Sequence, residues 1–224
     1  MFIKTSIEPR SINLFKLVVN TQANLEAPQE QLKSGDTIEN ENIILKFNEG
    51  RQKDSALNFS ILDKKSNTEN VFDYLSRFWP SYCKKYNWHN SGAYDFRPID
   101  NLFEPLVYSE LVDAKITRGS FTSKMTFYFE KMDRKTKQMA MKVIVHVTVD
   151  QDFDVVKFDV DLGSLPTVYL DGYEFVAVFE ALDFDNNKTF YTDSNGLEMQ
   201  ERILNYRTYY DFSTWGDKDY PDHN

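Results

Sequence analysis

The stretch MKVIVHVTVD, residues 141–150, places a valine at every second position from Val143 to Val149. The residues between the valines are Ile144 and the polar His146 and Thr148. Successive side chains of a β-strand point to opposite faces of the sheet, so this stretch predicts a strand with one buried face and one wet face.

The same alternation continues in residues 155–162. Apolar Val156, Phe158 and Val160 alternate there with charged Lys157, Asp159 and Asp161. The acidic stretch 150–154 between the two strands is short, which predicts a hairpin connection.

Runs rich in Val, Ile, Phe, Tyr and Thr recur along the whole chain and are bounded by Gly, Asn, Asp and Pro. They predict strands at 12–20, 43–47, 57–63, 92–97, 107–117, 121–131, 139–149, 155–162, 173–181 and 188–192. A short helix is expected at 70–79, before Pro80, and a loop at 63–70. Because no alternation of strands and helices appears, we expect an all-β fold, a large antiparallel β-sandwich.

The chain has 224 residues, enough for one large β domain. The polar stretch 23–42, which contains Pro28 and Gly35, is expected to be a linker. It would separate residues 1–22, the end of a small preceding β module, from the main β domain at 43–224.

The formal net charge is −9. A negatively charged surface repels a phosphate backbone, so nucleic acid is not an expected partner. Neither a membrane span nor an apolar run of signal-peptide length is found in the sequence, so we expect no membrane association of this chain.

The sequence offers few groups for catalysis. Its single cysteine, Cys83, excludes an intrachain disulfide, and the three histidines have no metal-ligand spacing. Asp159 and Asp161 share one strand face, where an acid–base or calcium role competes with a plain exposed face. A second acidic cluster has the oxygen ligands that calcium favours but not the EF-hand spacing, and we interpret it as a turn: Asp183, Asp185, Asn186 and Asn187.

Two segments have an unusual residue order. SGAYDFRP occupies residues 91–98, and FYTDSNGLEMQER occupies residues 190–202, followed by NYR at 205–207. In the second segment we assign Asp193, Asn195 and Gly196 to a turn and not to a site, since Asn-Gly supplies positive φ.

Both segments resemble landmarks of glycoside hydrolase family 38, in particular the lysosomal-type α-mannosidases. The resemblance covers roughly residues 38–207 and implies a galactose-mutarotase-like supersandwich that is incomplete in this chain. It also implies that the catalytic residues and a zinc ion belong to a (β/α) barrel that this chain lacks. On this basis we expect no catalytic residue, metal ligand or cofactor in the chain.

The resemblance further implies a part of a retaining enzyme that hydrolyses terminal α-mannose from glycans in mannose metabolism and glycoprotein degradation. The expected partners are the catalytic barrel, in the same polypeptide or on a second chain, and α-mannosyl glycans. The parent enzyme would be lysosomal or secretory. Tyr94 is the candidate substrate contact, either at the rim of the active site or as a plain sheet aromatic, while Arg97 is expected to form a structural ion pair.

Other hypotheses stay open. The chain could be a stand-alone carbohydrate-binding or interaction module with a closed sandwich. A weaker hypothesis is a sugar-epimerase-like enzyme, for which His146 would have to face a carboxylate. Asn58 and Asn187 begin Asn-x-Ser/Thr motifs, which matter only in a secreted protein.

Overall fold

The computed structural model describes residues 28–50, 56–81, 107–108, 110–132, 139–163, 172–193 and 195–204. It divides into two compact units, Met1–Leu182 and Asp183–Asn224, which are described separately below. The described residues form strands and turns and contain no helix, and accordingly none that could cross a membrane. The expected all-β class is confirmed.

The first unit contains a sheet of five antiparallel strands in the order β1-β7-β8-β9-β10. Their bounds are β1 Gln29–Gln31, β7 Glu110–Arg118, β8 Thr122–Met132, β9 Met139–Asp150 and β10 Val156–Leu162. The hairpin expected at 150–154 is confirmed as the turn that joins β9 to β10.

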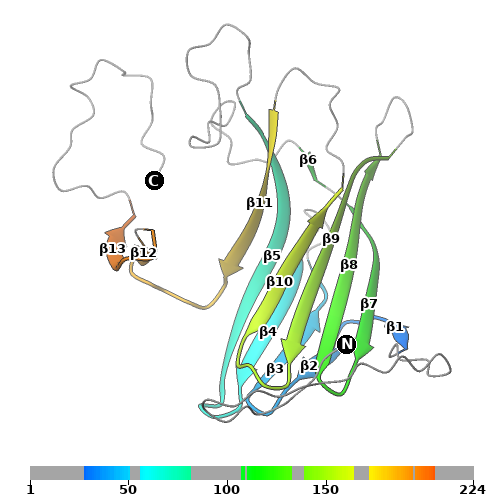
Figure 1. The fold of residues 1–224 in the computed structure, drawn as a ribbon, viewed down its shortest axis with the longest axis horizontal. Coiled ribbons are helices and arrows are strands. Elements are labelled where there is room, and N and C mark those ends of the chain that lie inside the picture. The colour runs from blue at the N-terminus through cyan, green and yellow to red at the C-terminus, as the bar shows by residue number, and fades with distance from the viewer. Residues whose placement is uncertain are drawn as a thin grey trace, which may run out of the picture. The chain divides into compact units, whose positions relative to one another are not determined.

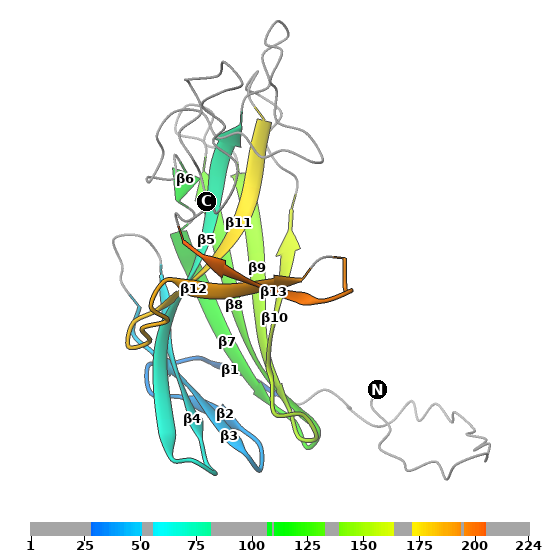
Figure 2. The ribbon, with the colours of Figure 1, turned by 90° about the vertical axis from the view of Figure 1, so that its left-hand side faces the viewer.

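A second sheet of six strands follows the order β11-β5-β4-β3-β2, with β6 paired to β5. The bounds are β2 Thr37–Glu39, β3 Ile43–Asn48, β4 Leu57–Asp63, β5 Thr68–Ser81, β6 Val107–Tyr108 and β11 Gly172–Ala181. Figures 1 and 2 show the two sheets stacked as the two layers of an antiparallel sandwich, as expected from the sequence.

The core lies between the two sheets and is built by alternate residues of both. Val143, Val145, Val147 and Val149 of β9 have no solvent exposure, which confirms the alternation seen in the sequence. Rings meet across the layers, with Phe47 and Phe127 centroids 5.2 Å apart. The buried residues around these contacts form one cluster: Leu32, Ile38, Ile43, Leu45, Phe47, Leu57, Phe59, Tyr74, Ala114, Ile116, Met125, Phe127, Phe129, Met141 and the four valines.

One end of the sandwich is joined by the side chain of Asn40, which is 4% exposed. Its Nδ2 donates hydrogen bonds to the carbonyl oxygens of Asp150 (2.9 Å) and Phe153 (2.8 Å), in the turn between β9 and β10. Its Oδ1 accepts from the backbone N–H groups of Asn42 and Ile43 at 2.9 Å each. Asn40 therefore connects a turn of one sheet to a turn of the other.

The helix expected at 70–79 is wrong, because these residues lie inside β5. Tyr74 and Ser76 of β5 face the core, while Asp73 and Leu75 point to the opposite face of the sheet, and all four are buried. A strand that is buried on both faces lacks the polar alternation that marks a strand in a sequence.

The stretch 23–42, expected as a linker, is described from Pro28 onward and contains β1 and β2. The loop expected at 63–70 is a turn over 64–67 that leads into β5. The strands expected at 12–20 and 92–97, and the small module at 1–22, lie outside the described residues.

The second unit contains a two-stranded hairpin, β12 Thr189–Asp193 and β13 Met199–Ile203. β13 is a strand that the sequence analysis did not predict. Both strands are short, and apolar side chains such as Tyr191 and Met199 are exposed on them, 58% and 65% respectively.

Candidate functional site

The histidine that the sequence singled out, His146, lies near the middle of the five-stranded sheet, on the face directed away from the core. The valines on either side of it fill the core, so alternation places the imidazole on the opposite face. Thr126 of β8 and Asp159 of β10 are its neighbours across the strands. Three strands thus bring a hydroxyl, an imidazole and carboxylates together.

Both ring nitrogens of His146 are engaged. Nδ1 lies 3.1 Å from Oγ1 of Thr126, and Nε2 lies 3.3 Å from Oδ2 of Asp161. The carboxylate that reaches the ring is therefore that of Asp161, and not that of the directly opposite Asp159. This pairing could not be read from sequence spacing, because it depends on the register of β9 against β10.

The order hydroxyl, imidazole, carboxylate is the order found in nucleophilic hydrolase sites. Here, however, Thr126 is only 3% exposed. A nucleophile must be accessible to its substrate, and the hydroxyl of Thr126 is not. His146 does face a carboxylate, as the epimerase hypothesis requires, but neither ring nitrogen is free to act as a base. We interpret the cluster as a structural network that fixes the imidazole.

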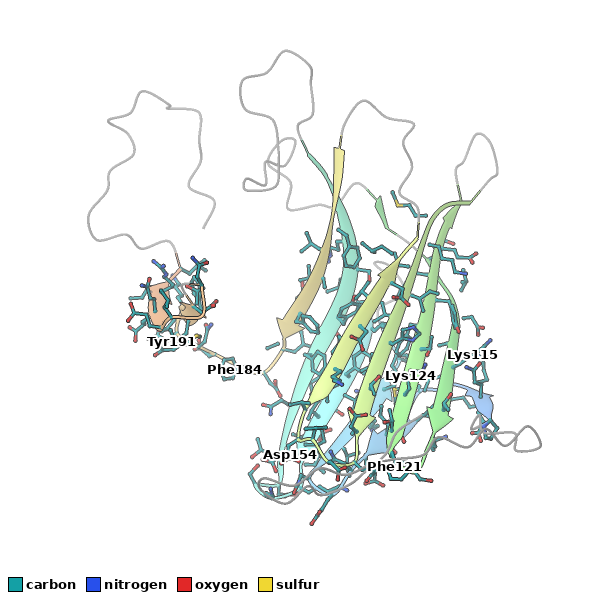
Figure 3. All side chains as sticks on the ribbon, in the orientation of Figure 1. Lys115, Phe121, Lys124, Asp154, Phe184 and Tyr191 are labelled. Atoms are coloured by element: carbon teal, nitrogen blue, oxygen red, sulfur yellow. The ribbon has the colours of Figure 1, made fainter. Side chains whose placement is uncertain are left out.

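Charges of both signs surround this cluster on the same face of the sheet. Lys115 lies 3.4 Å from Asp113, and Lys157 lies 3.3 Å from Asp150. The hydrogen bond that Asp113 accepts from the Gln31 side chain, helped by Lys115, lowers the pKa of its carboxyl group. Figure 3 shows the side chains of this face, Lys115 and Lys124 among them. Interspersed, paired charges are typical of a solvated sheet face.

A row of polar side chains crosses the outer face of the other sheet. Nδ2 of Asn48 donates to Oδ1 of Asn58 at 2.9 Å, and Nδ2 of Asn58 donates to Oδ1 of Asp73 at 2.6 Å. Asp73 is only 2% exposed, so its carboxylate depends on such partners. This row could not be predicted from the sequence, because its members come from three strands.

The row also bears on the two Asn-x-Ser/Thr motifs. The amide of Asn58 is engaged with Asp73 inside the sheet, whereas Asn187 is exposed in a turn of the second unit. Of the two, Asn187 is the more exposed, while Asn58 is half-buried.

The acidic cluster at 183–187, predicted as a turn, leads into one at Asn187 and Lys188. Oδ1 of Asp185 accepts the backbone N–H of Asn187 at 2.8 Å, and Oδ1 of Asn186 accepts that of Lys188 at 3.1 Å. Asn187 and Lys188 have positive φ values of 49° and 62°. Among the described residues, no group of three His, Cys, Asp or Glu side chains is placed to hold a metal ion.

The turn between β12 and β13 has the predicted chemistry. Asn195 and Gly196 have φ values of 53° and 72°, and the N–H of Gly196 donates to Oδ2 of Asp193 at 2.8 Å. On the strands, the hydroxyl of Tyr191 donates to Glu201 at 3.0 Å, and this hydrogen bond raises the pKa of Tyr191. Figure 3 labels Tyr191 on this hairpin.

The candidate substrate contact, Tyr94, lies outside the described residues, as do Cys83, His89, Arg97 and His223.

The chain matches the family model of the "Glycosyl hydrolases family 38 C-terminal domain" over residues 38–218. It is also similar to alpha-mannosidase 2 from Homo sapiens, with 22% identity over 200 residues. That match covers 89% of this chain but only 15% of the human protein. The match to the family model extends over most of the chain, and the sandwich agrees with a β domain: the chain belongs to glycoside hydrolase family 38, in the C-terminal domain of that family.

Proposed function

We propose that this chain is part of a retaining α-mannosidase that removes terminal α-linked mannose from glycans in mannose metabolism and glycoprotein degradation. The observation that carries the proposal is the match to the family's C-terminal domain over residues 38–218. The similarity to a protein named alpha-mannosidase 2 supports the choice of mannose as the sugar. The lysosomal type, and a lysosomal or secretory location of the parent enzyme, belong to the same proposal.

In this proposal, the chain supports and borders the active site, and the chemistry takes place on a catalytic barrel. Retaining hydrolysis needs a nucleophilic carboxylate and an acid/base carboxylate about 5–5.5 Å apart. The expected zinc ion finds no suitable donor set among the described residues. As the resemblance to the family implies, the proposal assigns both carboxylates and the zinc ion to the barrel.

Tyr94 is proposed to contact the substrate from the β domain. A phenol stacks on the apolar face of a sugar ring and donates a hydrogen bond to its hydroxyl groups. In the assembled enzyme, Tyr94→Phe is expected to raise KM by up to about tenfold, the effect of one lost hydrogen bond. An unchanged KM together with a lower melting temperature would identify Tyr94 as a sheet aromatic.

The alternative, a stand-alone carbohydrate-binding module, requires a closed sandwich with an aromatic patch. The ring of Phe179 at the edge of the described six-stranded sheet is 51% exposed and supplies an aromatic group for such a patch. The match to the family's C-terminal domain over residues 38–218 favours the α-mannosidase proposal.

The first test is the mass of the native protein in its source cells. A species much larger than 26.3 kDa, or a tightly bound barrel chain, is expected. A free species of 26.3 kDa would favour the stand-alone module.

The second test is activity. The purified 224-residue chain is expected neither to cleave aryl α-mannosides nor to bind zinc tightly. Turnover by this chain that disappears on chelation would contradict the assignment of catalysis to a barrel polypeptide.

A further inference from the structure

N-linked glycosylation attaches a sugar chain to the side-chain nitrogen, Nδ2, of an asparagine in an Asn-x-Ser/Thr motif. In the folded protein this nitrogen must reach solvent, and the fold must not depend on it as a hydrogen-bond donor. The chain contains two such motifs, Asn-Phe-Ser at 58–60 and Asn-Lys-Thr at 187–189. The structure describes both, and they differ in exposure and in hydrogen bonding.

The motif at 187–189 occupies a tight turn that leads into β12. Asn187 and Lys188 have φ values of 49° and 62°. The N–H of Thr189 donates to the carbonyl oxygen of Asn186 at 2.9 Å. Two adjacent positive φ values closed by such a hydrogen bond are typical of a type I′ turn. Asn187 is therefore the first of the two central residues of the turn.

The side-chain amide of Asn187 takes no part in holding this turn. Oδ1 of Asp185 accepts the backbone N–H of Asn187, and Oδ1 of Asn186 accepts that of Lys188. Among the described residues, none accepts a hydrogen bond from Nδ2 of Asn187. Asn187 and Lys188 are both exposed. A sugar can therefore be bonded to this nitrogen without the loss of a contact.

The motif at 58–60 is in the opposite situation. Nδ2 of Asn58 donates to Oδ1 of Asp73 at 2.6 Å, and Asp73 is 2% exposed. The other two residues of the motif, Phe59 and Ser60, are buried as well, at 0% and 4% exposure. A sugar bonded to Nδ2 of Asn58 would collide with the carboxylate beside it. The folded sandwich therefore excludes a glycan at Asn58.

We infer that Asn187 carries an N-linked glycan in the parent enzyme and that Asn58 does not. This inference rests on the proposed function, which includes a lysosomal or secretory location of the parent enzyme. Asn-x-Ser/Thr motifs are modified in secreted proteins, on surface loops. Because the transfer precedes folding, a chain modified at Asn58 would fail to close the sandwich and would be absent from the folded protein.

The transfer replaces one bond of the sugar donor by another. The donor is an oligosaccharide on a lipid pyrophosphate, and Nδ2 of Asn187 forms a bond to C1 of its first sugar. The bond between that carbon and the pyrophosphate oxygen breaks, and the lipid pyrophosphate leaves with the electron pair. The amide gives one proton to a base of the transferase, so no oxidant or reductant is needed.

The first measurement uses the native protein, isolated from its source cells with an antibody to this chain. Its aryl α-mannosidase activity is measured on the same preparation. A peptide N-glycosidase then releases the glycans in water labelled with heavy oxygen, which converts each glycosylated asparagine into a labelled aspartate. Mass spectrometry of the peptides should find the label at position 187 and an unmodified asparagine at position 58.

Variants of the full-length protein, expressed in the same cells, give the matched comparison. Thr189→Ala abolishes the motif but leaves the amide of Asn187 in place, whereas Thr189→Ser keeps the motif. Gel mobility should show the loss of one glycan from Thr189→Ala and no loss from Thr189→Ser. Ser60→Ala, which abolishes the other motif, should leave the number of glycans unchanged.

An active mannosidase with an unmodified Asn187 would overturn the inference and leave the proposed function standing. A glycan at Asn187 on a protein without mannosidase activity would support the site and overturn the proposed function. A glycan at Asn58 in the folded protein would overturn the second half of the inference.

Discussion

At the scale of single residues, Phe59 holds the two layers together. It has no solvent exposure, and its ring lies 5.5–5.8 Å from those of Phe47, Phe72, Phe127 and Phe158. Two of these four rings belong to the opposite sheet, so loss of the side chain would leave a cavity between the layers.

Phe59→Ala is expected to lower the free energy of unfolding by about 3–5 kcal/mol, through lost burial and the cavity left behind. Urea titration followed by circular dichroism measures the change. Phe153→Ala, at a ring that is 60% exposed, is the control and should change stability by less than about 0.5 kcal/mol. Equal effects of the two substitutions would contradict the described core.

Tyr74 carries a second prediction for single residues. Burial of its phenol raises its pKa above 10.0, while the hydrogen bond from Ser76 opposes that shift. Above pH 10 the unfolded chain releases this proton more readily than the folded chain, so stability falls as the pH rises. The wild type should lose stability between pH 9 and 11 more steeply than Tyr74→Phe, as measured by urea midpoints. Parallel slopes for the two proteins would show that the phenol is not buried.

At the scale of elements, the turns at one end of the sandwich are joined by Asn40, whose amide makes four hydrogen bonds. Asn40→Leu keeps the volume but leaves two carbonyl oxygens and two N–H groups without this partner. We expect a loss of about 2–4 kcal/mol, since each buried polar group left unpaired costs about 1–3 kcal/mol and water recovers part of it. Thermal or urea unfolding measures it.

The neighbouring Asn42 provides the control for that prediction. Its side chain donates to Asp154 in an exposed position, so Asn42→Ala should cost less than about 1 kcal/mol. A larger cost at Asn42 than at Asn40 would show that the buried amide does not carry the connection.

The elements also show what sequence patterns can and cannot predict. β9 and β10 were predicted closely, because one wet face makes the two-residue period visible. β5 was mistaken for a helix, since Asp73 and Leu75 are buried on one face and Tyr74 and Ser76 on the other. The contact of His146 with Asp161 was beyond prediction for a different reason: it requires the register between two strands.

At the scale of the whole molecule, the first unit has one core that both sheets share. Unfolding of either sheet would expose the buried inner face of the other. We therefore expect the two layers to unfold together. The slowest amides of β4 and β9 should then exchange with the same free energy of opening in hydrogen-exchange measurements. A clearly lower value for one of the two sheets would contradict a shared core.

The double burial of β5 has a consequence for how the protein tolerates variation. In a saturation mutagenesis survey scored by folded yield, β9 should show tolerant and intolerant positions in strict alternation, because its outer side chains are wet. Along residues 73–76 of β5 that rhythm should vanish, with every position intolerant of change. The pattern of accepted substitutions at these positions would then lack the two-residue period and resemble that of a buried helix. The same lack of alternation is the reason that the sequence predicted a helix here.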